Sequence, residues 1–567
     1  KRVEDNRFIK GEGKYTDDFN MDNQTYAIYV RSPHAHANIK GVDTSKAEAM
    51  EGVVKVFTGK DIADAGIVGT ICGWQVDFKN GDTMKEPGHP IMVADKVRHV
   101  GDAVALVIAE DRQTARDAAG LVEVNYEVLD AVVDPKAATQ DGAPLVHDDV
   151  PNNTIFDWEL GNKEETDAAF EKAHHITELS YHNQKLIPNA IEPRAALGHY
   201  DSNEDKYTLY TTSQNPHLAR LVIAAFVLSI PEHKLRVISP DVGGGFGSKI
   251  FVYNDECGVL WAAKQIGRPV KWTADRTEAF FTDCHGRDHV TDAKIALDKE
   301  GKIIGLRTKT YASLGAYLSN FSSCVPTYLH GTLMQGLYTS PAVHVDVTAV
   351  VTHTVPVDAL RGAGRPEATY GIERLVETAA REIGMDPAEF RLKNFIPPFD
   401  GVKQPGYQTQ VALQYDSGNY EGALKKALKN ANYEKLKKRK GEAEERQARA
   451  TRGGRRSERS SRAWRGRRPR SSGPQRPCGR PRRPRRRSPR RSVARHQETV
   501  LRRRGRRRGG RRGRRASGRS RRRGRGRRGA GGCRGTCREG PGGQGRGRER
   551  RTGRGASRRR SRRERPC

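Results

Sequence analysis

The sequence has 567 residues and a formal net charge of +34, which is distributed unevenly along the chain. Residues 451–567 contain 49 Arg and five Glu without Lys or Asp, so this segment alone carries +44 and residues 1–450 carry −10. No run reaches the ~18 apolar residues expected of a membrane span, and residues 1–10 lack the apolar core of a secretory signal. The length indicates several domains.

The cysteines of the acidic part are scattered, without the spacing of a metal site. They are Cys72, Cys257, Cys284 and Cys324. This usage favours a reduced, cytoplasmic setting over a disulfide framework. Because the chain starts at Lys1 rather than at Met, we expect the true N-terminus to lie upstream.

Residues 1–130 are predicted to form an α+β domain. Residues 102–109 read Asp-Ala-Val-Ala-Leu-Val-Ile-Ala, which is typical of a buried strand. Asp111 is placed to cap a short helix that ends at Ala119. Residues 121–128 then alternate apolar and polar side chains, which predicts a strand with one buried face.

A second domain, residues 156–440, is predicted after a proline-containing linker over residues 131–155. Its first half is expected to contain a strand over 207–213. A helix should then begin at Pro216, because proline is favoured at the first helical position. A second strand is predicted over 235–239.

Three further helices are predicted in this domain. The first covers 255–266, with Asn254 as its N-cap and Gly267 just after its end. The second covers 366–383, where apolar side chains recur on one helical face. The third begins after Asp386, in the capping-box sequence Asp-Pro-Ala-Glu.

The end of the chain differs from the rest. Residues 396–419 are predicted to be connection, and residues 441–567 have one aromatic residue, Trp464. We expect this tail to be disordered because it cannot bury a core. One interpretation is an arginine-rich nucleic-acid-binding arm. We favour translation of a GC-rich gene in a shifted frame, since the tail lacks lysine and interleaved aromatics.

Four of the five residues at 243–247, Gly-Gly-Gly-Phe-Gly, lack a side chain. Glycines between a strand and a helix allow positive φ and close approach of a ligand, and their N–H groups can cradle an oxygen-rich cofactor. The alternative is a tight turn without a ligand. The dinucleotide motif fails because Ser248 or Ile250 takes its last position, and the P-loop fails because Ser248 precedes Lys249.

Three further patches accompany the glycine loop. They are Pro-Asn-Ala-Ile-Glu-Pro-Arg-Ala at 188–195, Thr-Ser-Gln-Asn-Pro-His at 212–217, and Ala-Leu-Arg-Gly-Ala-Gly-Arg-Pro-Glu at 359–367. The last opens a helix, and a helix N-terminus with two arginines nearby is a natural anion site. Each patch alone could be a cap, a turn or surface charge. Their combination in this order is specific.

With these patches, the sequence resembles the molybdopterin-binding large subunits of the xanthine dehydrogenase and aerobic carbon monoxide dehydrogenase family over residues 1–440. The likeness includes Arg-Val-Glu-Asp from position 2 and Tyr-Asp-Ser-Gly at 415–418. It implies an α/β hammerhead domain over 1–130 and the first of two molybdenum-cofactor-binding domains over 156–440. It also implies a molybdenum hydroxylase, which inserts oxygen derived from water and passes two electrons to other centres.

The resemblance assigns site roles residue by residue. The glycine loop would contact the cofactor through its backbone, the glutamine would hydrogen-bond an oxygen ligand of the metal, and the arginine would orient or polarise substrate. No side chain of this chain is expected to coordinate the metal. The assigned residues are Gln214, Gly244, Gly245, Phe246, Gly247 and Arg361.

The sequence also departs from parts of the family. Copper-containing carbon monoxide dehydrogenases carry a copper-binding Cys where this chain has Gly362, and no other thiol in that loop could hold Cu(I). Leu360 replaces the usual aromatic residue of the loop. Ile250 stands where purine-oxidising members carry a glutamate, which argues against xanthine. The Gly-x-Gly-Glu motif of the general base is expected after residue 440, and the tail does not contain it.

The resemblance implies a molybdopterin cofactor in its cytosine dinucleotide form. The chain lacks the cysteine clusters of [2Fe–2S] domains and a recognisable FAD segment. In three-subunit members of the family those centres lie on separate subunits, so the resemblance implies an iron–sulfur small subunit and an FAD-binding medium subunit in a dimer of heterotrimers. The substrate would be a small molecule: CO, an aldehyde or an N-heterocycle. Two alternatives remain, an arginine-rich nucleic-acid-binding protein and a cofactor-free scaffold, under which Gln214 and Arg361 have no evident purpose.

Overall fold

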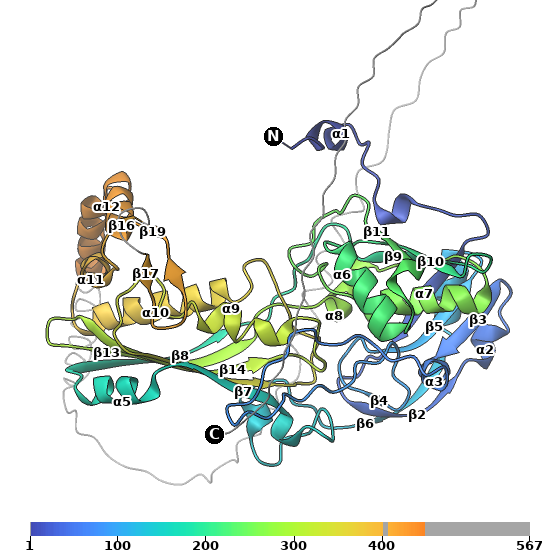
Figure 1. Cartoon of the computed structure of the whole chain (residues 1–567), viewed down its shortest axis with the longest axis horizontal. Helices are drawn as coiled ribbons and strands as arrows, with labels where there is room; N and C mark the ends of the chain where they lie inside the picture. The colour runs from blue at the N-terminus through green and yellow to red at the C-terminus, as the bar shows by residue number, and fades with distance from the viewer. Residues whose placement is uncertain (1, 401–405, 448–567) are drawn as a thin grey trace, which may run out of the picture. The chain divides into compact units, whose positions relative to one another are not determined.

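The computed structural model describes residues 2–400 and 406–447, and the predicted α+β class is confirmed (Figure 1). From position 448 onward the predicted arginine-rich tail lies outside the described residues, so its disorder stays a prediction. In the described part of the chain, no helix has the length and apolar character needed to cross a membrane.

The first sheet has seven strands and draws on both predicted domains. Its strands, in spatial order, are β11 (Leu235–Ile238), β10 (Lys206–Thr211), β9 (Ala195–Asp201), β12 (Val270–Thr273), β1 (Thr25–Arg31), β5 (Ala103–Ala109) and β3 (Val53–Thr58). Strand β1 runs parallel to β12, with Thr25 opposite Val270. Every residue of β5 is buried, as its apolar run predicts. The N-terminal segment therefore supplies β1, β3 and β5 to a sheet whose other four strands come from later in the chain.

Helix α7 (Asn254–Ile266) packs on this first sheet, and its fit depends on one glycine of β9. A Cβ atom on Gly198 would lie 3.0 Å from the Cα of Leu260, so a larger residue would push the helix away. Leu260 is fully buried in the apolar core that the sheet and α7 share. This packing sets the position of the helix that follows the glycine loop.

A three-stranded sheet belongs to the N-terminal segment. It consists of β4 (Lys96–Val97), β2 (Ala37–Asp43) and β6 (Glu123–Val128). In β6, the partly buried Val124 and Tyr126 alternate with exposed polar residues, but Val128 is 61% exposed. The predicted alternation therefore holds up to Tyr126, and the last residue of the strand does not join the buried face.

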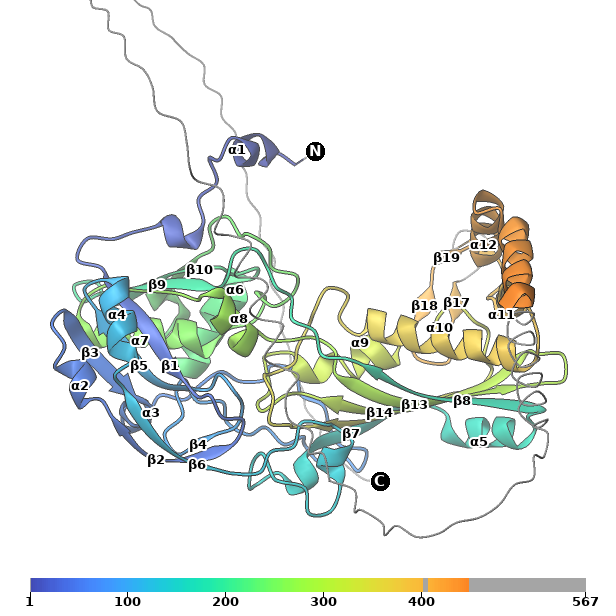
Figure 2. The same ribbon diagram turned by 180° about the vertical axis from the view of Figure 1, so that it is seen from behind.

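The second large sheet has five strands. Its order is β7 (Thr154–Gly161), β15 (Val343–Val350), β14 (Ile303–Ser313), β13 (His289–Leu297) and β8 (His175–Asn183). Helix α10 (Arg365–Glu382) packs on β8 and β13, and helix α5 (Lys163–Glu171) packs on β14 and β15. Figures 1 and 2 show these helices on opposite faces of the sheet.

The remaining elements are short. They are α1 (Asp5–Ile9), η1 (Thr16–Asp18), α2 (Ser45–Glu48), α3 (Gly59–Asp64), α4 (Arg112–Ala119), η2 (Ala137–Thr139), η3 (Pro151–Asn153), α6 (Pro216–Leu221), a π-helical turn (Val222–Val227), η5 (Glu232–Lys234), α8 (Arg276–Thr282), η6 (Ser322–Cys324), α9 (Tyr328–Gly331), α11 (Pro387–Asn394) and α12 (Tyr420–Asn430). Within residues 131–155, Val146 and Val150 are buried, so this predicted linker is packed against the five-stranded sheet.

Most predicted helix ends are confirmed, and one is wrong. Asp111 and Asp386 accept backbone N–H bonds as N-caps of α4 and α11, and Gly267 ends α7 with φ +66°. The N-cap of α7 is Tyr253, whereas Asn254 is already helical. The Asn254 side chain instead accepts from the N–H of Thr70 and donates to two carbonyl oxygens of the N-terminal segment. A long-range contact therefore takes precedence over the local cap.

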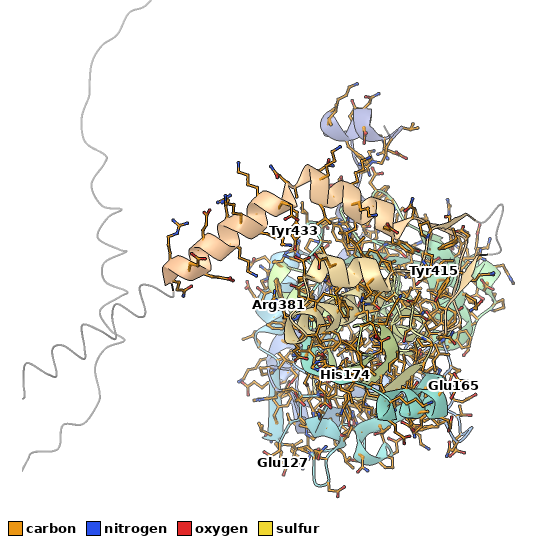
Figure 3. All side chains as sticks on the ribbon, turned by 90° about the vertical axis from the view of Figure 1, so that its left-hand side faces the viewer. Glu127, Glu165, His174, Arg381, Tyr415 and Tyr433 are labelled. Carbon is orange, nitrogen blue, oxygen red and sulfur yellow. The ribbon has the colours of Figure 1, made fainter. Side chains whose placement is uncertain are left out.

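The predicted connection over 396–419 contains two small antiparallel pairs. These are β16 (Phe399–Asp400) with β19 (Ser417–Gly418), and β17 (Tyr407–Gln408) with β18 (Gln414–Tyr415). After α12 the chain is helical again over 433–447, so the prediction of a disordered tail from residue 441 is wrong for residues 441–447. Tyr433 on this last helix donates to Asp386 Oδ2 at 3.2 Å, and Figure 3 shows it above Arg381 of α10.

We expect the substitution Leu260→Ala to lower the free energy of unfolding by about 2–5 kcal/mol, because it removes a fully buried side chain from the contact between α7 and β9. Chemical denaturation of the full chain measures this change. The substitution Gln265→Ala on the exposed face of the same helix is the control and should change stability by less than about 0.5 kcal/mol. Equal effects of the two substitutions would contradict the packing described.

Candidate functional site

The glycine loop joins β11 to α7, and its backbone is in a conformation that favours glycine. Gly244, Phe246 and Gly247 have φ values of +99°, +53° and +104°. A Cβ on Gly247 would lie 2.3 Å from the carbonyl oxygen of Ala359, and one on Gly245 would lie 2.2 Å from Gln214 Oε1. The glycines are thus required both by backbone conformation and by the close approach of two other segments.

Gln214, one of the predicted site residues, lies against this loop. It follows β10 and precedes α6, whose N-cap is Asn215. The N–H of Gln214 donates to the carbonyl oxygen of Lys249 at 2.7 Å, and the N–H of Gly247 donates to Gln214 Oε1 at 3.0 Å. The glutamine side chain is exposed, with its oxygen held by the loop. Its amide nitrogen donates to no acceptor in the part of the chain that the structure describes, so it can act as a donor to a ligand.

Arg361, the second predicted site residue, reaches the loop from the other side. Its N–H donates to the carbonyl oxygen of Phe246 at 2.8 Å. The turn that follows has positive φ at Gly362, Ala363 and Gly364, and α10 begins at Arg365. The Arg361 guanidinium is exposed and makes no ion pair with any residue that the structure describes. The structure thus brings Gln214, the glycine loop and Arg361 together.

Glu192 and Arg194, from the patch at 188–195, are functional candidates that sequence reasoning did not single out. Glu192 Oε2 accepts from the N–H of Gly243 at 2.6 Å and from Lys249 Nζ at 3.0 Å. The presence of this patch in the family pattern was the only signal for it. The role of each residue depends on partners 51 to 89 residues away in the sequence, which spacing alone does not reveal.

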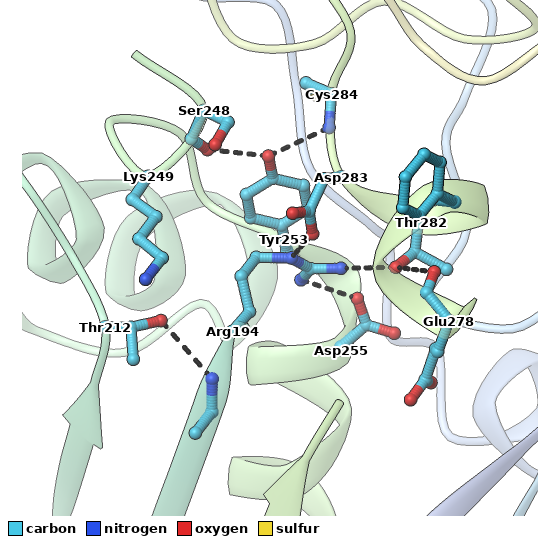
Figure 4. A network of polar contacts seen from close by, with 12 residues as sticks. Arg194, Thr212, Ser248, Lys249, Tyr253, Asp255, Glu278, Thr282, Asp283 and Cys284 are labelled. Carbon is cyan, nitrogen blue, oxygen red and sulfur yellow. Dashed lines mark hydrogen bonds and ion pairs between the residues drawn. The ribbon is translucent and has the colours of Figure 1, made fainter. Parts of the chain in front are cut away.

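Arg194 is the centre of a buried polar network beneath the loop (Figure 4). It is 1% exposed, and its guanidinium donates to Asp255 Oδ2 at 2.8 Å and Asp283 Oδ1 at 2.7 Å. The ring of Tyr253 lies against the guanidinium, 3.7 Å from centroid to Cζ. The Tyr253 hydroxyl donates to the carbonyl oxygen of Ser248 at 2.6 Å. The network therefore connects β9 and α7 to the end of the glycine loop.

Two buried acids near the site have opposite pKa shifts. Burial alone would raise the pKa of Asp255, but Arg31 and Arg194 together lower it below its ordinary value. Asp358, three residues before Arg361, has no ion-pair partner among the described residues, and burial raises its pKa to about 7. Its oxygens accept from the N–H groups of Phe321 at 2.9 Å and Ala359 at 2.7 Å. It therefore anchors the start of the Arg361 turn.

The hydrogen-bond donors at the site that have no protein acceptor fit an oxygen-rich, anionic group. Within residues 2–400 and 406–447, the N–H groups of Gly244, Gly245 and Phe246 donate to no protein acceptor. The Arg361 guanidinium adds positive charge nearby. Such a set of fixed N–H donors and an arginine suits pterin and phosphate oxygens. No group of three His, Cys, Asp or Glu side chains with metal-binding geometry is found in this part of the chain.

We expect the pair Gly245→Ala and Gln214→Ala to be non-additive. A methyl group at position 245 would collide with Gln214 Oε1, so Gly245→Ala alone should destabilise the chain by about 1 kcal/mol. In the Gln214→Ala background this cost should largely disappear. Thermal unfolding of the four chains measures the coupling, and strict additivity would show that the two residues are not in contact.

We expect Arg194→Met to lower stability by about 3–5 kcal/mol at pH 7, because it leaves the buried Asp283 without its cation and leaves Asp255 paired with Arg31 alone. The pKa of Asp255 is lowered in the folded state, so its contribution is present above the ordinary Asp range and is lost as pH falls through it. The difference from the original chain should therefore shrink below about pH 4. Arg220→Met, in an exposed pair with Glu232, is the control and should change little at any pH.

Comparison with known proteins gives a consistent result. Residues 10–130 match the aldehyde oxidase and xanthine dehydrogenase a/b hammerhead domain, and residues 146–395 match the molybdopterin cofactor-binding domain. The carbon monoxide dehydrogenase large chain of Afipia carboxidovorans is 37% identical over 455 residues, which cover 77% of this chain and 54% of that protein. The nicotine 6-hydroxylase large subunit of Paenarthrobacter nicotinovorans is 33% identical, over 78% of this chain and 53% of that subunit.

A solved structure agrees with these relatives. The crystal structure of the Cu,Mo-CO dehydrogenase superposes with a TM-score of 0.72 at 35% identity, covering 79% of this chain and 56% of that one. The chain thus spans about half the length of the curated relatives it matches. Both predicted domain types are present in the predicted order, and the motif residues meet at one loop. The chain thus carries the a/b hammerhead and molybdopterin cofactor-binding domains of the xanthine dehydrogenase and carbon monoxide dehydrogenase family.

Proposed function

We propose that this chain is the catalytic large subunit of a molybdenum hydroxylase, with Gln214, the glycine loop at Gly244–Gly247 and Arg361 as its cofactor and substrate contacts. The observation that carries this proposal is the meeting of these segments around unused N–H donors, in a chain of this family. When bound, the molybdenum cofactor would supply two-electron oxidation of substrate with oxygen derived from water. We propose that the cofactor is the cytosine dinucleotide form.

The residues of this chain would bind and orient. The N–H groups of Gly245 and Phe246 would hold oxygen atoms of the cofactor, and fixed donors of this kind need no reorganisation as charge changes on those oxygens. The Gln214 side-chain N–H would donate to the same group, since its Oε1 is held by Gly247. The Arg361 guanidinium, which has no protein partner among the described residues, would orient a polar substrate.

We propose a substrate of the aldehyde or N-heterocycle class, oxidised without copper. Gly362 offers no thiolate for Cu(I), and its φ of +106° suits a glycine at this point of the turn. Ile250 has no carboxylate to offer a purine, and it packs in an apolar cluster with Phe251 and Tyr253. The relative that hydroxylates nicotine supports the heterocyclic class.

We also propose two partner subunits and a cytoplasmic location for the complex. Electrons would leave through an iron–sulfur small subunit and an FAD-binding medium subunit, in a dimer of heterotrimers within the cytoplasm. The general-base glutamate would come from a second cofactor domain, which the frameshift interpretation places beyond about residue 440. Resequencing the gene around that codon tests this interpretation. An uninterrupted frame that encodes the arginine-rich tail would overturn it and would favour the nucleic-acid-binding alternative.

The direct test is the content and activity of the complex purified from its natural source. We expect molybdenum and a pterin nucleotide in proportion to this chain, no copper, and substrate-dependent dye reduction with an aldehyde or an N-heterocycle. Stoichiometric absence of molybdenum from a complex with the repaired reading frame would overturn the proposal. Copper in proportion to molybdenum would overturn the copper-free assignment.

We expect Arg361→Met to lower kcat/KM by about 100-fold while the molybdenum content stays unchanged, because the guanidinium acts on substrate rather than holding the loop. Steady-state kinetics of the complex measure this effect. Arg374→Met, on the exposed face of α10, removes an arginine of similar exposure and should leave the kinetics unchanged. Equal kinetics in the Arg361→Met complex would exclude a substrate role for this side chain.

A further inference from the structure

One carboxylate holds both ends of the glycine loop. Glu192 Oε2 accepts from the N–H of Gly243, at the start of the loop, at 2.6 Å. The same oxygen accepts from Nζ of Lys249, at the end of the loop, at 3.0 Å. Lys249 Nζ also donates to the carbonyl oxygen of Glu192 at 2.8 Å, and the N–H of Glu192 donates to the carbonyl oxygen of Gly243 at 3.2 Å. The two ends are therefore tied to a single residue on another segment.

Lys249 also connects the loop to Gln214. Its carbonyl oxygen accepts from the N–H of Gln214 at 2.7 Å, while the Gln214 side chain accepts from the N–H of Gly247. The Lys249 side chain and backbone thus hold the two segments that the proposed site needs. In Figure 4 the Lys249 side chain extends from the part of the loop that carries Ser248.

The Lys249–Glu192 ion pair is largely buried, which makes separating its two charges unfavourable. Lys249 is 2% exposed, and the Glu192 side chain is 16% exposed. Burial lowers the pKa of Lys249, and the charge of Glu192 opposes this shift. Separating the two groups would leave a buried ammonium without its carboxylate, which costs more than breaking an exposed pair. The clamp therefore resists opening of the loop.

The loop needs such a clamp because its own bonds are few. Gly244, Phe246 and Gly247 have positive φ, and three N–H groups of the loop have no acceptor within the described residues. Glycine-rich backbone is entropically costly to hold in one conformation. Fixed donors are effective only when their positions are set before a ligand arrives.

We propose that Glu192 and Lys249 are positioning residues that clamp the ends of the glycine loop and hold its N–H donors in register with Gln214. What the loop binds rests on the proposed function, whereas the clamp itself can be tested on the chain without any cofactor. Neither side chain is required to touch the substrate. The pair acts through the backbone of the loop.

Amide hydrogen exchange of the full chain tests the clamp directly. In Lys249→Met, the amides of residues 243–250 should exchange about tenfold faster than in the original chain. The two chains are compared at denaturant concentrations that give them the same free energy of global unfolding. The structural control is Lys271→Met, which removes another buried lysine whose Nζ bonds two backbone carbonyl oxygens near Phe19. It should lower global stability without accelerating exchange of the loop.

The double variant Glu192→Gln with Lys249→Met separates positioning from simple charge pairing. Removing both charges leaves no unpaired buried ion, so global stability should recover relative to Lys249→Met. Exchange of the loop should stay fast, because the clamp remains broken. If loop exchange recovers together with stability, or if Lys271→Met accelerates it equally, the positioning role is overturned.

Cofactor retention gives the second readout. In the purified complex, Lys249→Met and the double variant should lose molybdenum and pterin on dilution at least several-fold faster, while Lys271→Met should not. Unchanged loss from these variants would overturn the role in presenting donors to the cofactor. If the original complex holds no molybdenum, the proposed function fails instead, and the exchange data still decide whether the clamp exists.

Discussion

The site depends on a buried arginine held between two aspartates. Arg194 ends up almost fully enclosed, and its guanidinium bonds Asp255 at the start of α7 and Asp283 after α8. A buried guanidinium is tolerated only where its donors and charge are matched, so the positions of these three segments are set together. Because Tyr253 stacks on the arginine and bonds the carbonyl oxygen of Ser248, the end of the glycine loop is set with them.

The glycine loop, positioned by Arg194, in turn contacts the other segments of the site. The loop holds the Gln214 side chain through Gly247 and the Arg361 turn through Phe246. Asp358 then anchors the beginning of that turn through the N–H of Ala359. Among the described residues, the donors left without a protein acceptor include three N–H groups of the loop, the Gln214 side-chain amide and the Arg361 guanidinium. The chemistry proposed for the site uses the donors that the fold does not need.

Local features of the sequence predicted much of this molecule. Strand β5, the cap at Asp111, the αL end at Gly267 and the helix after residue 364 all follow from nearby residues, and the structure confirms them. The likeness to a family predicted the two domain types. Their exact boundaries stay predictions, since β1 and β12 share one sheet.

What the sequence did not reveal depends on distant partners. Asn254 has the side chain of an N-cap but bonds the backbone near Thr70 and His89, because a buried loop there needs its polar groups satisfied. Glu192 and Asp358 are ordinary acids in the sequence, and their roles appear only when Gly243 and Phe321 are placed beside them. No local periodicity carries such information.

The parallel pairing of β1 with β12 has a consequence for how the chain is made. Thr25 leaves the ribosome long before Val270, so one edge of β1 has no partner until the strand that contains Val270 has been synthesised. Pairings between such distant residues are slow to form, and an open strand edge is prone to associate with other chains. The N-terminal segment is therefore expected to need protection during synthesis, and a product that stops before residue 270 would keep that edge open.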